Sequence, residues 1–346
     1  MNPDHGQLAL LLSSLPDRPV AKDYQAAAKK LLPYIQSWVP PMGEGQSSAR
    51  LTFLTTVGRH DLSLARLIEG HLDATQILRE AKRPVDKHAL YAIWASGGPA
   101  DSLHIAQTGP TGTGLELTGN KPFCSGSDIA DRALIYIYPN EQLVEVDMQA
   151  LHGSDQVDFD GKAWEAAAFS ETHTWSVALQ GLPITQDNYI GSYKWYFERP
   201  GFCLGALGPA ACWTGGAMAL VDSVRQRTLK DGHAKAHLGA MAALACSMQS
   251  LLRWGAQQID ADPDNTSGQL FPSALLVRHH IDRGCSEILD RFGRTLGPRP
   301  YAFERDNARR IAELTLYTRQ CHAERDLEEL GTYLEEHPEF LSDETH

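Results

Sequence analysis

Hydrophobic and polar positions follow three different patterns along the chain. In residues 1–86, apolar residues recur at three- and four-residue spacing, which is typical of amphipathic helices. The spacing predicts helices over residues 24–38 and 61–82, separated by the helix-breaking pair Pro40 and Pro41. We therefore expect the first part of the chain to form an N-terminal helical domain.

In residues 87–187 the pattern changes to short apolar runs and alternation, which is typical of β-strands. A hairpin is expected around Pro139 and Asn140, where turn residues separate two such runs. The runs predict a compact, β-barrel-like middle domain of about six or seven strands. The expected strands cover residues 89–95, 103–106, 114–118, 133–138, 143–148 and 174–182.

Helical spacing returns in residues 188–346, which predicts a C-terminal four-helix bundle and, with the middle domain, an α+β fold. Residues 201–220 are rich in Gly and Ala, so helix backbones are expected to approach closely there. Pro209 should kink its helix or lie in the first turn. The polar residues 260–268 should form a loop. The expected helices cover residues 202–226, 234–259, 273–292 and 308–330.

Composition and charge narrow the range of functions. The 346 residues include 31 Lys and Arg against 43 Asp and Glu, a net charge of −12. This balance argues against binding to nucleic acid or to anionic membranes, both of which require basic residues. No run of about 18 or more apolar residues is present, and the N-terminus lacks the basic region of a signal peptide. A soluble, cytoplasmic protein is expected.

Cysteine and histidine spacing gives no sign of a metal site. The six cysteines are scattered singly, without a Cys-x-x-Cys pair, and are expected to be small buried hydrophobes in a reducing compartment. His233 and His237 have helical spacing but lack the glutamate of a zinc-binding His-Glu-x-x-His motif. The neighbours His279 and His280 are also not expected to bind metal.

Five short segments carry recognisable motifs. The most specific is LTGNKPFCSG at residues 117–126, followed by Ala130-Asp131-Arg132. The others are VGRHDLSLAR at residues 57–66, FERPGF at 197–202 followed by GALG at 205–208, VRQR at 224–227, and DRFGRTLG at 290–297 followed by RDNAR at 305–309. With the order of the three domains, these segments resemble the acyl-CoA dehydrogenase family over roughly residues 20 to 330.

The resemblance implies an FAD held between the domains and gives several residues a role in binding it. Phe123 would cover the flavin ring with its π-face, and Ser125 would donate a hydrogen bond near the reactive flavin nitrogen. Ser96 could donate to phosphate or flavin. Arg227 would contact the FAD pyrophosphate of a neighbouring subunit, and Gly293 would lie in a turn near the flavin.

The segment that carries the usual catalytic glutamate of that family is absent, and residues 316–326 stand in its place. Dehydrogenation of a thioester needs a carboxylate for the α proton. Glu198 is the leading candidate, because its aromatic neighbours would raise its pKa, although a nearby helix N-terminus would favour the charged form. Glu198 could instead cap a helix or pair with Arg199. His322 and Glu324 are the reserve candidates.

The resemblance implies an FAD-dependent acyl-CoA dehydrogenase that forms an α,β-double bond in an acyl thioester. An electron-transfer flavoprotein would reoxidise it, and the chain would form a homodimer or homotetramer. A flavin monooxygenase or oxidase on the same fold, which does not need the lost carboxylate, remains an alternative. A non-catalytic homologue without flavin is another. A polyanionic CoA would need a basic patch, for which Arg291, Arg294 and Arg299 are the densest candidates.

Overall fold

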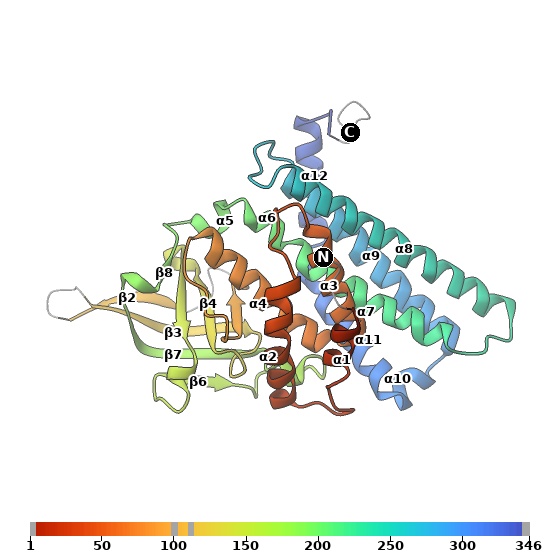
Figure 1. Cartoon of the computed structure of the whole chain (residues 1–346), viewed down its shortest axis with the longest axis horizontal. Coiled ribbons are helices and arrows are strands. Elements are labelled where there is room, and N and C mark those ends of the chain that lie inside the picture. The colour runs from red at the N-terminus through yellow and green to blue at the C-terminus, as the bar shows by residue number, and fades with distance from the viewer. Residues whose placement is uncertain (1–4, 98–102, 110–113, 341–346) are drawn as a thin grey trace. The chain divides into compact units, whose positions relative to one another are not determined.

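The computed structural model describes residues 5–97, 103–109 and 114–340 (Figure 1). Contacts divide the chain into two compact units, Met1–Pro40 with Ser63–Phe202, and Pro41–Leu62 with Cys203–His346. These units do not coincide with the three domains expected from the sequence, whose boundaries stay a prediction. The expected fold class is confirmed, because helices precede and follow a middle region of strands.

The first unit contains all the described strands, and among its described residues the second unit contains helices but no strand. The expected helices at residues 24–38 and 61–82 are confirmed, whereas the helices His5–Leu12 and Ser47–His60 were not anticipated. The helices up to the strands are α1 (His5–Leu12), α2 (Ala21–Trp38), α3 (Ser47–His60) and α4 (Leu62–Glu80). Those after the strands are α5 (Trp195–Glu198), α6 (Gly201–Gly205), α7 (Leu207–Arg225), α8 (Gly232–Ala261), α9 (Leu270–Leu296), α10 (Arg299–Phe303), α11 (Arg305–Tyr317) and α12 (Glu324–Glu336).

The strands form two four-stranded sheets, in the orders β1-β4-β5-β8 and β2-β3-β7-β6. β1 pairs with β4 in parallel and the other pairs are antiparallel, including the expected hairpin β4–β5 around Pro139 and Asn140. The short strands β6 and β8 were not expected, and β3 is longer than predicted. The strands are β1 (Tyr91–Trp94), β2 (His104–Thr108), β3 (Gly114–Cys124), β4 (Arg132–Ile137), β5 (Gln142–Asp147), β6 (Val157–Asp160), β7 (Trp175–Ile184) and β8 (Tyr189–Ile190).

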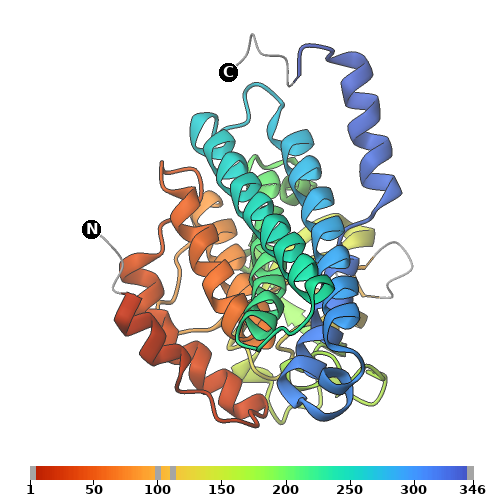
Figure 2. The same cartoon turned by 90° about the vertical axis from the view of Figure 1, so that its right-hand side faces the viewer.

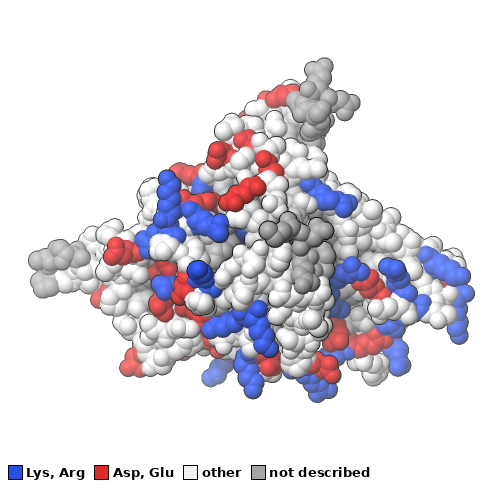
Figure 3. Space-filling view, viewed as in Figure 1, with Lys and Arg blue, Asp and Glu red and all other residues white. Residues whose placement is uncertain are grey.

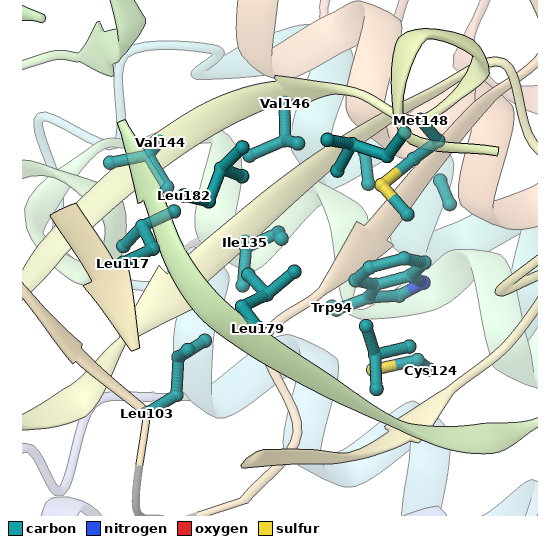
Figure 4. Close-up of a cluster of buried hydrophobic side chains, with 14 of the residues drawn as sticks. Trp94, Leu103, Leu117, Cys124, Ile135, Val144, Val146, Met148, Leu179 and Leu182 are labelled. Atoms are coloured by element: carbon teal, nitrogen blue, oxygen red, sulfur yellow. The ribbon is translucent and has the colours of Figure 1, made fainter. Parts of the chain in front are cut away.

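The β4 strand is buried on both faces, which explains its unbroken apolar sequence. Ile135 and its alternate neighbours point into a core shared by the two sheets, where Figure 4 shows Ile135 near Leu179 and Trp94. Leu134 and Tyr136 point to the opposite face, into a second cluster that includes residues of α4. The first sheet is therefore held between the second sheet and α4.

The long apolar helix expected over residues 202–226 is divided into α6 and α7, and Pro209 lies in the first turn of α7. Proline is tolerated there because the first backbone N–H groups of a helix have no partner within it. By length and composition, the segment Gly201–Arg225 could cross a membrane, but 78% of its most apolar window is buried. This burial is typical of a core helix.

The expected single helix over residues 308–330 is wrong. The backbone leaves the helix after Tyr317 and enters α12 only at Glu324. Arg278 of α9 donates a hydrogen bond of 2.7 Å to the carbonyl oxygen of Gln320, and Ala323 has a φ of +50°. A buried arginine on another helix thus holds the break, and this constraint is not visible in the local periodicity.

Small residues bring α3 and α7 into close contact, as the Gly- and Ala-rich sequence predicted. A Cβ atom on Gly58 would lie 2.6 Å from the carbonyl oxygen of Cys212. A Cβ on Gly215 would lie 2.6 Å from the backbone nitrogen of Arg59 and would also collide with the carbonyl oxygen of Thr55. On the other side of the bundle, α8 and α9 lie side by side (Figure 2).

We expect Gly215→Ala to lower the free energy of unfolding by about 1–3 kcal/mol, because backbone atoms must move to admit the methyl group. Gly331→Ala in the middle of α12 is the matched control, since nothing lies within 4 Å of its added Cβ. The control should gain about 0.5–1 kcal/mol from better helix propensity. Urea denaturation measures both, and equal effects of the two substitutions would contradict the close packing.

Candidate functional site

The candidate site lies where β3 ends and the chain turns away from the sheet. The pairing of β3 with β7 is irregular between Lys121 and Cys124, and Phe123 has a φ of +59°. A positive φ is uncommon for a bulky residue and is typical of functional positions. Cys124 points into the core, whereas Phe123 is 55% exposed, and its ring meets that of Trp164 edge to face with the centroids 6.4 Å apart. The strand end thus presents an aromatic surface.

The turn after Phe123 is held by bonds to its backbone. The Trp94 indole Nε1–H donates to the carbonyl oxygen of Ser125 at 3.0 Å. The backbone nitrogens of Gly126 and Ser127 donate to the carbonyl oxygens of Thr172 and His173 at 2.8 and 3.2 Å. Since these bonds come from two directions, the position of Ser125 is fixed by the surrounding fold rather than by its own turn.

The Ser125 hydroxyl lies between a cation and another hydroxyl. Arg66 of α4 donates from Nε to Ser125 Oγ at 2.7 Å, and Ser125 Oγ lies 3.2 Å from Thr174 Oγ1. The Arg66 guanidinium also stacks over the ring of Phe169, 5.0 Å from its centroid. Thr172 Oγ1 lies 3.1 Å from Thr174 Oγ1. The site therefore combines a positive charge with three hydroxyl groups.

Sequence reasoning missed Arg66, Thr172 and Thr174. Arg66 stood within the VGRHDLSLAR segment, and its position inside an otherwise apolar stretch of the helix was the available signal. No local pattern marked the two threonines, because they precede β7 and tertiary pairing alone brings Thr174 to Ser125 and, through Thr174, connects Thr172 to it.

A histidine–aspartate pair lies on the same pair of segments. His173 Nδ1 is 2.5 Å from Asp128 Oδ1, and the imidazole stacks on Trp175 with centroids 3.8 Å apart. Both side chains are partly exposed. The pair places an imidazole and a carboxylate near the turn that holds Ser125.

Glu198 lies elsewhere in the first unit, as the last residue of α5, and its side chain is exposed. The aromatic neighbours expected from the sequence are present, since Phe197 meets Tyr136 at 4.8 Å. Burial raises the pKa of Tyr136 to about 12. Glu198 as a base stays a prediction.

Arg199, the other partner considered for Glu198, is buried and pairs with Glu80 at 2.8 Å and Asp73 at 3.7 Å. Burial opposes its charged form, but the two carboxylates outweigh burial and raise the pKa of Arg199. Arg199, which was considered as an alternative partner of Glu198, thus pairs with Asp73 and Glu80 and fastens the end of α5 to α4.

Of the other predicted site residues, Arg227 and Gly293 belong to the second unit, and Ser96 belongs to the first. Arg227 forms a bidentate ion pair with Glu304, and the pair lowers the pKa of the Glu304 carboxyl. Gly293 lies inside α9 rather than in a turn, where a Cβ would come within 2.6 Å of the Tyr301 hydroxyl. Ser96 is exposed, and residues 98–102 of its segment lie outside the described residues.

The reserve bases and the basic patch also have local partners. His322 contacts Asp326 at 3.2 Å just before α12, and Glu324 is exposed at the start of that helix. Arg291 and Arg294 pair with acidic residues one turn earlier on α9, at 2.6 and 3.3 Å. In the part of the chain that the structure describes, no group of three or more His, Cys, Asp or Glu side chains is arranged to hold a metal ion.

Comparisons with known proteins identify the fold. The complex of TdsC from Paenibacillus sp. A11-2 with FMN and indole matches with a TM-score of 0.74 and 16% identity, over 96% of this chain and 98% of that one. KijD3 in complex with FMN and a dTDP-linked amino sugar matches with a TM-score of 0.74 and 14% identity, over 99% and 94% of the two chains.

Butyryl-CoA dehydrogenase from Megasphaera elsdenii matches with a TM-score of 0.72 and 13% identity, over 96% of this chain and 99% of that one. At these identities the likeness shows the fold, and the acyl-CoA dehydrogenase-like fold expected from the sequence is confirmed. No known family profile matches the chain. A search of curated proteins also finds no match.

Proposed function

We propose that the chain is a flavin-dependent oxidoreductase that binds the flavin ring against Phe123 and Ser125. The observation that carries the proposal is the end of β3, where an exposed aromatic ring at positive φ stands beside a hydroxyl held by a cation. A flavin ring is flat and largely apolar on its faces, with hydrogen-bonding atoms along its edge. The FMN in the TdsC and KijD3 structures supports this assignment.

The residues present fit such a ring. Phe123 and Trp164 offer aromatic surface and exclude water from one face, and Ser125 offers a hydrogen bond at the edge. The charge of Arg66 favours a ligand that carries or develops negative charge. When bound, the flavin supplies the electron transfer and oxygen chemistry that protein side chains lack.

FAD and FMN differ in the phosphate groups that the protein must bind. FAD, which the resemblance implies, needs cations for a pyrophosphate. Arg227 is the predicted one, and its guanidinium would have to exchange Glu304 for the phosphates. FMN makes a smaller demand because it ends in a single phosphate. Both flavins therefore belong in the binding experiment.

Oxygen chemistry, as in a flavin monooxygenase or oxidase, is the reaction that the site favours. The side chains that contact Ser125 are an arginine and a threonine, whereas removal of an α proton needs a carboxylate. An arginine cannot act as a base, because it keeps its proton at all physiological pH values. The TdsC protein is a dibenzothiophene monooxygenase, which is in line with this choice.

Dehydrogenation of an acyl thioester, with an electron-transfer flavoprotein as electron acceptor, is the second candidate. The observation that favours it is Glu198, a carboxylate next to the aromatic side chains of α5 and β4. The likeness to butyryl-CoA dehydrogenase supports this candidate to the same degree as the other fold matches support oxygen chemistry.

Self-association through α8 is part of the proposal. Residues 236–252 contain no Asp, Glu, Lys or Arg, yet Ala236, Gly239, Ala243 and Cys246 are exposed along one face of the helix. Figure 3 shows this region as largely white surface. A solvent-facing helix is normally charged, so an uncharged face indicates burial against a partner. A second copy of this chain is the partner that the family resemblance implies.

Flavin binding tests the main proposal directly. The purified protein should bind FMN or FAD and absorb near ~450 nm, and Phe123→Ala should weaken binding about tenfold through loss of ring contact. Phe197→Ala removes another exposed aromatic ring of the same unit and is the matched control. Titration with each flavin measures both, and a protein that binds neither flavin would contradict the proposal.

The two reaction classes differ in their response to oxygen and to thioester. We expect the protein with reduced flavin to consume oxygen, and its oxidised flavin to keep its colour when butyryl-CoA is added. If butyryl-CoA bleaches the flavin and Glu198→Gln slows the bleaching by about 10²–10⁴-fold, dehydrogenation is the correct reaction.

A charge on the α8 face should separate the subunits. We expect Ala243→Glu to raise the dissociation constant of the oligomer at least about 100-fold, because an unpaired carboxylate would be buried in the contact. Gln257→Glu, on an exposed position of the same helix beyond the uncharged stretch, is the control. Sedimentation velocity measures the mass, and a wild-type monomer at all concentrations would exclude this surface.

A further inference from the structure

An unbroken row of hydrogen bonds runs from Arg66 to the backbone of Phe169. Arg66 Nε donates to Ser125 Oγ at 2.7 Å, and Ser125 Oγ lies 3.2 Å from Thr174 Oγ1. Thr174 Oγ1 lies 3.1 Å from Thr172 Oγ1, which donates to the carbonyl oxygen of Phe169 at 2.9 Å. The row joins α4 to the turn after β3 and to the segment before β7.

The two ends of the row determine its direction. A carbonyl oxygen can only accept, so the single proton of Thr172 points to Phe169. Thr172 must then accept from Thr174, whose own proton is thereby used. Thr174 in turn accepts from Ser125. At the other end, the guanidinium can only donate, which agrees with the same direction. All four bonds form together in this arrangement alone.

The surroundings hold the row in place. The side chains of Thr172 and Thr174 are 0% and 1% exposed, so water does not compete for their protons. Arg66 stacks over the ring of Phe169, the residue whose carbonyl oxygen ends the row. Bonds in a buried row also polarise one another in the same direction. The orientation of the Ser125 proton is therefore fixed before any ligand arrives.

We infer that Ser125 acts on its ligand as a hydrogen-bond acceptor and that the site consequently prefers reduced over oxidised flavin. Ser125 donates its proton to Thr174 and accepts a hydrogen bond from Arg66 with one lone pair. Its second lone pair is left to accept from a ligand N–H. This reverses the donor role expected from the sequence. A flavin ring gains an N–H at its central ring and tends toward negative charge when it is reduced, and the cation of Arg66 favours that charge.

The inference rests on the proposed flavin function, and a pair of titrations tests it. FMN is titrated into the protein without oxygen, once oxidised and once reduced with dithionite, and the two dissociation constants are compared. The wild type should bind reduced FMN at least about tenfold more tightly, the effect of one well-placed hydrogen bond. The midpoint potential of bound FMN should be raised by about 30 mV for each tenfold preference.

Substitutions of Thr172 and Thr174 change the direction in which the Ser125 hydroxyl donates without changing Ser125 itself. Thr172→Val removes the acceptor of Thr174, so Thr174 can donate to Ser125 and Ser125 can donate to the ligand. The preference for reduced FMN should then fall about tenfold. Thr172→Ser keeps the row and should keep the preference. Thr174→Val frees the Ser125 proton at the next link and should act like Thr172→Val.

The results distinguish a failure of the acceptor role of Ser125 from a failure of flavin binding. If both redox forms bind equally, or if the two valine variants keep the wild-type preference, the flavin function stands and the fixed acceptor role is wrong. If neither form binds, the flavin function fails and the inference fails with it. Loss of the preference in both valine variants, with its retention in Thr172→Ser, establishes the row as its cause.

Discussion

The pairing of β3 with β7 is the constraint on which the candidate site depends. Near its end, β3 shifts register, so that Cys124 faces Trp175 and points into the core while Phe123 turns outward at positive φ. Thr172 and Thr174 lie just before β7, and Ser125 lies just after β3. The pairing of the two strands therefore brings the three hydroxyl groups together. A register slip of one residue would reverse every side chain at this edge.

The position of α4 is the second requirement, because it supplies the only cation among the side chains described at Ser125. Further along the helix, Ala74, Ile77 and Leu78 are buried against the first sheet. This apolar contact fixes the rotation of the helix and brings Arg66 to Ser125 about two turns earlier. Core packing thus determines the rotation of α4, and this rotation determines where the charge of Arg66 lies.

Local patterns predicted much of the fold because each predicted element had a strong periodicity of its own. The apolar runs of β4 and β5 and the Gly- and Ala-rich α7 are examples, since burial on several sides leaves little choice of residue. The break after Tyr317 was missed because its cause is Arg278, on another helix.

At the site, resemblance to a family indicated Phe123 and Ser125, but the groups that set the chemistry of Ser125 could not be predicted. Thr174 is 49 residues away along the chain, and Arg66 is 59 residues away. Such contacts depend on tertiary pairing, which leaves no periodic trace in a single sequence. Glu198 shows the converse, since a sequence rich in aromatic residues did produce an aromatic cluster but left the carboxylate exposed.

The row of hydroxyls also limits what this site can do with protons. A relay that transfers protons needs a group at one end that can release or accept them near neutral pH, and a guanidinium and a backbone carbonyl do neither. The row from Arg66 to Phe169 therefore orients and charges the site without conducting protons. A proton that a reaction consumes or releases here would need another carrier, and the partly exposed imidazole of His173 lies against Asp128 on the same two segments. Charge would then come from Arg66 of α4, and proton transfer from residues of the segments beside β3 and β7.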